Sequence, residues 1–214
     1  MIPAKPSVTA REAIERLREG NKRFVEGKST RSVLMSHAQR AALAEQAQEP
    51  FAIILGCSDA RAPAEILFDQ GLGDLFVIRV AGNVVAPSQV GSVEFAAAQF
   101  GTRLVVVLGH SQCGAVAATL DELQEPASNR SPNIKSIVDR VRPSVEGLLR
   151  TELKNDRKAL LRHAIRANVG VSVSHLRHGS EILESLIQSD GLVVVGAEYS
   201  LETGEVEFFD GLDG

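Results

Sequence analysis

The sequence predicts an α/β fold with a central, mostly parallel sheet of four strands plus an antiparallel edge strand, and helices on both faces of the sheet. Short apolar runs without polar alternation recur along the chain, which is typical of strands that are buried on both faces. Segments with a helical spacing of apolar residues separate these runs, as in doubly wound folds. The four parallel strands are expected at residues 51–55, 75–80, 104–108 and 192–197.

The antiparallel strand is expected at residues 205–209, because a hairpin-type turn at residues 201–204 joins it to the last parallel strand. A chain of 214 residues is long enough for one α/β domain with a substantial core and too short for two. We therefore expect a single domain over residues 1–214, with an N-terminal helical arm at about residues 9–49.

Two helices are predicted in this arm. The first covers residues 9–25, where Thr9 is a candidate N-cap and Glu12 stands at the capping-box position. The second covers residues 36–49 and ends before Pro50, because proline disfavours a helical conformation in the residue that precedes it. The apolar face of the first helix could pack on its own sheet or on a partner subunit, and the sequence leaves both options open.

The remaining helices are placed by apolar spacing and by prolines. Pro63 can open a short helix, since the first helical position needs no N–H group. Residues 124–132 are polar and are predicted to form a loop, and Pro143 is expected to interrupt the helical pattern that starts at Asn133. The predicted helices are residues 63–67, 89–100, 113–123, 133 to the interruption, and 148–187 in one or two pieces.

Composition narrows the choice of partners and location. The net charge is −4 at pH 7 and the pI is about 5.8, so the chain lacks the basic field that nucleic-acid binding needs. No run of about eighteen apolar residues occurs, so no membrane span is expected. The first residues contain no apolar segment of the kind found in signal peptides, which predicts a cytoplasmic protein; a signal sequence that was trimmed away remains the alternative.

Three candidate metal ligands follow two of the predicted strands. Cys57 follows the first strand, and His110 and Cys113 follow the third, so all three should meet where open α/β sheets place their ligands. Two thiolates and an imidazole suit Zn²⁺, and three protein ligands leave a fourth position for water or substrate. The alternatives are two buried thiols without a metal, or a structural zinc with a fourth ligand that the sequence does not identify.

A charged pair accompanies the first ligand. Asp59 and Arg61 stand two and four residues after Cys57. An arginine can hold a carboxylate through two parallel hydrogen bonds and so compete with the metal for it. The carboxylate, which only accepts hydrogen bonds, could then orient a water molecule at the metal. The alternative is an ordinary salt bridge within a loop.

The Cys-x-Asp-x-Arg run at residues 57–61 and the His-x-x-Cys run at residues 110–113 resemble the β-class carbonic anhydrases, zinc enzymes that interconvert CO₂ and bicarbonate. The likeness extends from about residue 10 to residue 210 and includes the runs at residues 81–83 and 109–114. One departure is Ala60, where the family usually has serine. This substitution removes a hydroxyl near the charged pair but no ligand.

The resemblance also implies residues that bind substrate. Gln48 and Pro50 stand nine and seven residues before Cys57, as in the plant-type members of the family. By this likeness Gln48 would donate a hydrogen bond to a substrate oxygen in the site of a neighbouring subunit; the alternative is a solvated glutamine. The other positions that match the family's pocket, for which ordinary packing is the alternative, are Phe76, Ala81, Phe95 and Gly114.

The family's reaction would be reversible hydration of CO₂ to bicarbonate and a proton, by attack of hydroxide on one zinc ion per chain. The resemblance gives Asp59 the role of orienting the hydroxide, with Arg61 holding Asp59 and Gln48 polarising the substrate oxygen. Two alternatives stay open. One is hydrolysis of CS₂ or COS at the same site, and the other is a zinc-stabilised binding or regulatory protein without turnover.

Two further expectations concern assembly and pH. Gln48 can serve a neighbour's site only if subunits pair, so we expect a homodimer or a homotetramer built as a dimer of dimers.

Some family members close the site at low pH, when the aspartate binds zinc, and they carry a bicarbonate site of tryptophan, arginine and tyrosine. Arg79 and Tyr199 match two of these positions, but Ile54 stands at the third and the chain has no tryptophan. An isoleucine cannot donate the indole hydrogen bond, which predicts the open form at neutral pH.

Overall fold

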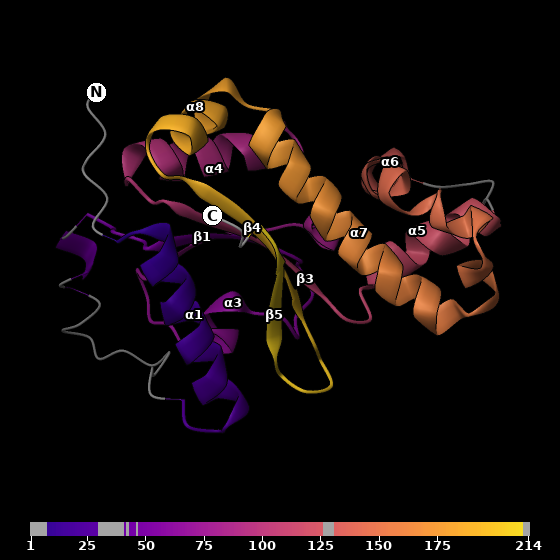
Figure 1. Ribbon diagram of the computed structural model, residues 1–214, viewed down its shortest axis with the longest axis horizontal. Coiled ribbons are helices and arrows are strands. Elements are labelled where there is room, and N and C mark those ends of the chain that lie inside the picture. The colour runs from indigo at the N-terminus through magenta and orange to yellow at the C-terminus, as the bar shows by residue number, and fades with distance from the viewer. Residues whose placement is uncertain (1–7, 30–40, 42, 46, 126–130, 212–214) are drawn as a thin grey trace.

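A five-stranded sheet runs through the centre of the protein in the order β2-β1-β3-β4-β5 (Figure 1). The computed structural model describes residues 8–29, 41, 43–45, 47–125 and 131–211. All neighbouring strands pair in parallel except β4 and β5, which are antiparallel. The predicted fold class is therefore confirmed. The strands are β1 (Ala52–Gly56), β2 (Leu75–Arg79), β3 (Leu104–His110), β4 (Val193–Tyr199) and β5 (Val206–Asp210).

Helices cover both faces of the sheet, as predicted. In Figure 1, α1 and α3 lie on one side, whereas α4, α7 and α8 lie on the other. The α-helices of the described residues are α1 (Ala10–Val25), α3 (Ala64–Leu67), α4 (Pro87–Gln99), α5 (Gly114–Gln124), α6 (Pro132–Val145), α7 (Arg157–His178) and α8 (Glu181–Ser189). Three short 3₁₀ helices join them: η1 (Ala81–Asn83), η2 (Leu148–Arg150) and η3 (Glu152–Asn155).

Alternate strand residues supply two separate cores. In β1, Ile54 packs in the cluster under α1, whereas Ile53 and Leu55 pack in the cluster under α4, α7 and α8. All three side chains are fully buried, because successive residues of a strand point to opposite faces and both faces are covered. A third cluster, under α5, α6 and the start of α7, includes Cys57 and Cys113. The candidate metal ligands therefore lie at the edge of a packed core.

The first helix packs on its own chain. Thr9 and Glu12 form the predicted capping box, and Leu17 is fully buried against the sheet. Asn21 donates hydrogen bonds to the carbonyls of Leu67 and Gly204, which fixes the helix to α3 and to the β4–β5 turn. Of the two options that the sequence left open, the structure shows the buried face of α1 on its own sheet.

Two predictions about helix ends were wrong. The helix predicted at 36–49 lies largely outside the described residues, but residues 47–50 are not helical, so it ends earlier than predicted. Pro143 lies inside α6 and does not interrupt it. A proline so close to the end removes only the hydrogen bond to the carbonyl of Asp139. The fully buried Val141 and Val145 keep this last turn packed.

The other predicted helices were found with small shifts, whereas the loop predicted at residues 124–132 lies mostly outside the described residues. The segment predicted at residues 148–187 in one or two pieces forms four elements, η2, η3, α7 and α8, and α8 continues to Ser189. Among the described residues, no helix combines the length and the apolar character needed to cross a membrane.

Candidate metal centre

Cys57, His110 and Cys113 meet at the carboxyl ends of β1 and β3, as predicted. Cys57 follows β1, His110 is the last residue of β3, and Cys113 is the N-cap of α5. Their ligand atoms lie within 4.8 Å of one another, and the two sulfur atoms are 4.0 Å apart. All three side chains are buried, with 6% exposure for Cys57 and 1% for each of the others.

The imidazole of His110 shows that this cluster fits a metal ion. Its Nδ1 atom lies 2.9 Å from the carbonyl oxygen of Ser111, so the Nδ1 proton can be donated there. Its Nε2 atom is buried and has no hydrogen-bond partner among the described residues. A buried polar atom without a partner costs about 1–3 kcal/mol. One nitrogen and two sulfur atoms are a donor set that Zn²⁺ accepts, and the Nδ1 contact is of the kind that orients a zinc-binding histidine.

The two thiols titrate as a pair. A hydrogen bond from the Cys113 thiol lowers the pKa of Cys57 to about 4, against the opposing effect of burial. The same contact, together with burial, raises the pKa of Cys113 well above its ordinary value. The contact between the thiols therefore favours one thiolate over two, and a divalent metal ion would favour deprotonation of both.

Arg61 holds Asp59 beside this cluster. Its Nε and Nη2 atoms donate to the two carboxylate oxygens of Asp59 at 2.9 and 2.7 Å, and its backbone N–H donates at 2.9 Å. These bonds hold the pKa of Asp59 well below its ordinary value. Its Oδ2 atom lies 3.8 Å from Nε2 of His110. The predicted pairing of Asp59 with Arg61 is confirmed as a contact, and it leaves the carboxylate ionised and facing the cluster.

Several contacts that hold the site together could not be predicted from the sequence. Arg79, at the end of β2, donates to the carbonyls of Cys57 at 3.0 Å and Asp59 at 2.5 Å. The backbone N–H of Gly82 donates to Sγ of Cys57 at 3.3 Å. Gly82 has a φ of 71°, a conformation that favours glycine, and Asn168 of α7 donates to its carbonyl at 2.8 Å. A glycine in the 81–83 run is typical of a backbone with positive φ, but nothing in the sequence links Asn168 to it.

The predicted substrate residues fall into two groups. Ala81 lies in η1 beside Gly82, and Gly114 is exposed and begins α5 directly after Cys113. Phe76 and Phe95 instead pack against each other, with ring centroids 6.4 Å apart. They lie at the β2 edge of the sheet, in or beside the core under α4, whereas Cys57 and Cys113 belong to the core under α5. The structure therefore brings only the first group next to the metal cluster of the same chain.

Gln48 also lies away from the metal cluster of its own chain. It is exposed and precedes β1, whereas Cys57 follows β1 at the opposite end. The five-residue strand between them spans about 16 Å. Within one subunit Gln48 therefore does not reach the cluster.

The residues at the three positions of the family's bicarbonate site make structural contacts in this chain. Tyr199 is buried and pairs with His110 across β3 and β4. Ile54 is fully buried in the same core as Tyr199, and Arg79 is bonded to the two carbonyls named above. Asp59 is bonded to Arg61, which is the arrangement predicted for the open form.

Comparison with known proteins agrees with this geometry. A family model described as carbonic anhydrase matches residues 52–206. A carbonic anhydrase of Mycolicibacterium smegmatis is 39% identical over 191 residues, which are 89% of each chain. The fold is similar to that of a β-carbonic anhydrase of Aspergillus fumigatus, with a TM-score of 0.72, 26% identity, and 83% and 84% of the two chains covered.

A second solved structure supports the fold alone. It belongs to the tetrameric β-carbonic anhydrases of Sordaria macrospora, with a TM-score of 0.70, 24% identity, and 79% and 85% of the two chains covered. The matched family model spans both sequence runs that contain the Cys57, His110 and Cys113 cluster. From the shared sequence and fold we conclude that this chain belongs to the β-class carbonic anhydrase family.

Proposed function

We propose that this protein is a zinc-dependent carbonic anhydrase that catalyses the reversible hydration of CO₂ to bicarbonate and a proton. The observation that carries the proposal is the buried cluster of Cys57, His110 and Cys113 beside a carboxylate that Arg61 keeps ionised. A structural zinc site has no need of the Asp59–Arg61 pair. Membership of the family supplies the substrate, because its relatives are named carbonic anhydrases.

The three ligands would hold one zinc ion per chain. Zinc supplies Lewis acidity, which allows water to ionise near neutral pH and act as a nucleophile. Two thiolates offset the formal charge of the metal, so this chain should need a higher pH for activity than a site of three imidazoles. The thiolate of Cys57 is also held by the N–H group of Gly82, which adds a hydrogen bond without adding charge.

Asp59 would orient the nucleophile. An ionised carboxylate only accepts hydrogen bonds, so it could accept the hydrogen bond of the attacking hydroxide and thereby direct the oxygen lone pair toward the carbon of CO₂. Arg61 fixes both carboxylate oxygens, and Arg79 fixes the backbone on either side of Ser58. Asp59 is thus held toward the site by two cations and is kept from binding the metal.

Substrate binding would involve two subunits, as in the plant-type members of the family. Gln48 would donate to a substrate oxygen in the partner's site, and Ala81 and Gly114 would line the site of their own chain. Phe76 and Phe95 would contribute apolar surface from the sheet edge, where Phe95 is 53% exposed. Because β2 is an open edge of the sheet, a second copy could cover it, and a homodimer or a tetramer would result.

The first prediction concerns the metal. Purified protein should contain about one zinc per chain, because three buried donor atoms are already gathered. Cys57→Ser and Cys113→Ser should each lose most of this zinc, since a serine hydroxyl is a poor ligand at neutral pH. Elemental analysis of the dialysed proteins measures both effects. Substantial zinc in Cys57→Ser would contradict the ligand assignment.

The second prediction concerns Asp59. The zinc-loaded protein should hydrate CO₂ in a stopped-flow assay, and Asp59→Asn should lower the rate by roughly 10–100-fold, because asparagine carries no charge and has only one acceptor oxygen, so it cannot both pair with Arg61 and accept a hydrogen bond from the nucleophile. Zinc content should stay unchanged. The matched control is Asp121→Asn, which removes a similar ion pair with Arg157 on the surface.

Three results would speak against this assignment. Asp59→Asn within about threefold of the parent rate would remove Asp59 from the mechanism. A zinc-loaded parent protein without any CO₂ turnover would favour a non-catalytic zinc protein. Turnover of CS₂ or COS without turnover of CO₂, measured in parallel, would assign the site to a different substrate.

The third prediction tests whether Gln48 acts across subunits. Gln48→Ala and Cys57→Ser should each be nearly inactive alone. Co-expressed in equal amounts, they should recover about a quarter of the parent activity, because half of the dimers are mixed and each mixed dimer has one complete site. Two inactive variants that give no recovery when mixed would contradict a role of Gln48 across subunits, and parent activity in Gln48→Ala alone would remove Gln48 from the mechanism.

The fourth prediction concerns the open form. The bonds from Arg61 lower the pKa of Asp59, so the carboxylate stays ionised and paired throughout the neutral range and loses this contact only well into acid. A crystal structure of the zinc protein near pH 7 should therefore show Asp59 on Arg61. An Asp59 oxygen at about 2.0–2.2 Å from zinc, the usual zinc–carboxylate distance, would show that this chain closes without a tryptophan.

A further inference from the structure

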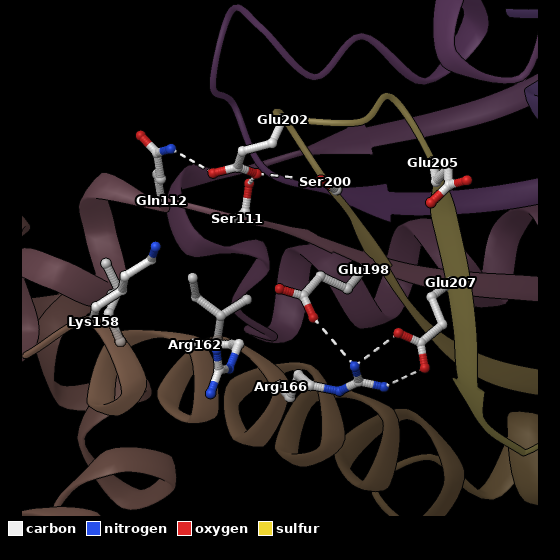
Figure 2. Close-up of a pocket in the computed structure, with 12 residues that line it drawn as sticks. Ser111, Gln112, Lys158, Arg162, Arg166, Glu198, Ser200, Glu202, Glu205 and Glu207 are labelled. Atoms are coloured by element: carbon white, nitrogen blue, oxygen red, sulfur yellow. Dashed lines mark hydrogen bonds and ion pairs between the residues drawn. The ribbon is translucent and has the colours of Figure 1, made fainter. Parts of the chain in front are cut away.

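The two residues between His110 and Cys113 contact a part of the fold that is distant in sequence. Ser111 and Gln112, which we call the ligand loop, form one wall of a cavity of about 430 Å³ between α7 and the β4–β5 hairpin. Figure 2 shows Glu202, from the β4–β5 turn, reaching across this wall to both residues. The ligand loop is therefore held by a segment that comes about ninety residues later in the chain.

The contacts of Glu202 divide evenly between the two loop residues. The hydroxyl of Ser111 donates to Oε2 of Glu202 at 2.7 Å, and Nε2 of Gln112 donates to Oε1 at 2.6 Å. Ser200 also donates to Oε2, at 3.2 Å, which steadies the carboxylate from its own hairpin. One carboxylate thus fixes both residues that separate the second metal ligand from the third.

Backbone contacts bring the turn and the loop into register. The N–H of Ser111 donates to the carbonyl of Tyr199 at 2.8 Å, and the N–H of Leu201 donates to the hydroxyl of Ser111 at 2.9 Å. These bonds extend the pairing of β3 with β4 past the end of β3. The hairpin and the ligand loop therefore behave as one hydrogen-bonded unit.

Gln112 needs such support because its backbone is strained. Its φ is 55°, in the left-handed region that residues other than glycine seldom adopt. A strained backbone persists when its surroundings determine it, and here the side chain of Gln112 is bonded to Glu202. The strain lies at the residue immediately before Cys113, where it sets the direction in which the third ligand leaves the loop.

The carboxylate of Glu202 is suited to this task at neutral pH. Hydrogen bonds from Ser111 and Gln112 lower its pKa to about 2, so both of its contacts are charge-assisted. Arg166, another charged group of the cavity, pairs with Glu198 at 3.6 Å and Glu207 at 2.9 Å. Glu205, on the same hairpin, points away from the loop in Figure 2 and meets the hydroxyl of Thr203 at 3.4 Å.

We propose that Glu202 is a positioning residue of the metal centre, which fixes Ser111 and Gln112 and so sets the separation of His110 and Cys113. This inference rests on the zinc site of the proposed function. Ligands that are already in place bind a metal without first being ordered, and they impose their own geometry on it. Weakening the Glu202 contacts should therefore loosen the metal and change its coordination, even though Glu202 does not touch it.

The test compares Glu202→Ala and Glu202→Gln with the matched control Glu205→Gln in the full-length zinc protein. The first measurement is the rate at which zinc passes from the folded protein to a chromogenic chelator. Glu202→Ala should release zinc about tenfold faster, the lower end of the effect seen for groups that orient metal ligands. Glu202→Gln, which keeps one acceptor oxygen, should fall between, and Glu205→Gln should match the parent.

The second measurement is the absorption spectrum of the cobalt(II)-substituted proteins, in which the thiolate and ligand-field bands report coordination geometry. These bands should shift in Glu202→Ala and stay unchanged in Glu205→Gln. If Glu202 only stabilised the hairpin, Glu202→Ala would lower the thermal midpoint while its cobalt spectrum stayed that of the parent. That result, or zinc release within twofold of the parent, would overturn the proposal.

A variant that does not fold and a parent protein that binds no metal can both be told apart from these results. If Glu202→Ala does not fold, Glu202→Gln and Ser111→Ala carry the same comparison, because each removes part of the contact. If the parent protein itself binds neither zinc nor cobalt, the proposed function fails, and the positioning role fails with it. If the parent protein binds zinc, and the Glu202 variants match it in zinc release and in cobalt spectrum, only the positioning role is rejected.

Discussion

The parallel pairing of β1 with β3 is the constraint on which the metal centre depends. Ile53 to Gly56 pair with Val105 to Leu108, so both strands run in the same direction and their carboxyl ends lie side by side. Cys57 follows one end and His110 completes the other, although fifty-two residues separate them in sequence. Since both strands are buried on both faces, a shift in this register would expose the core, and the packing of the sheet therefore fixes the spacing of the ligands.

Three charged side chains from different elements hold the loops that follow these strands. Arg79 bonds the backbone around Cys57, Arg61 bonds Asp59, and Glu202 bonds the two residues after His110. The carboxylates of Asp59 and Glu202 both stay ionised because hydrogen-bond donors contact them. Asp59 lies 3.8 Å from Nε2 of His110, so it adds negative charge beside the two thiols, which favours a divalent cation.

Much of this arrangement could be predicted from the sequence, because local chemistry determines it. The apolar runs predicted the parallel strands, and the two short motifs at their ends predicted Cys57, His110 and Cys113, as well as the pairing of Asp59 with Arg61. Residues two apart can form such a pair wherever the loop lies. The predicted interruption at Pro143 was wrong, because buried valines on both sides of the proline hold the end of α6 in place.

The sequence by itself determined which residues form the strands, which side chains could bind a metal, and that an ionised aspartate stands beside them. Only the tertiary structure decided which distant groups support them. Nothing near Gly82 indicates Asn168, and nothing near Gln112 indicates Glu202, since these contacts span 86 and 90 residues. The tertiary structure also separated Gln48, Phe76 and Phe95 from the metal cluster of their own chain. The reason is physical: sequence spacing sets local geometry, whereas contacts between elements depend on how the sheet and its helices pack.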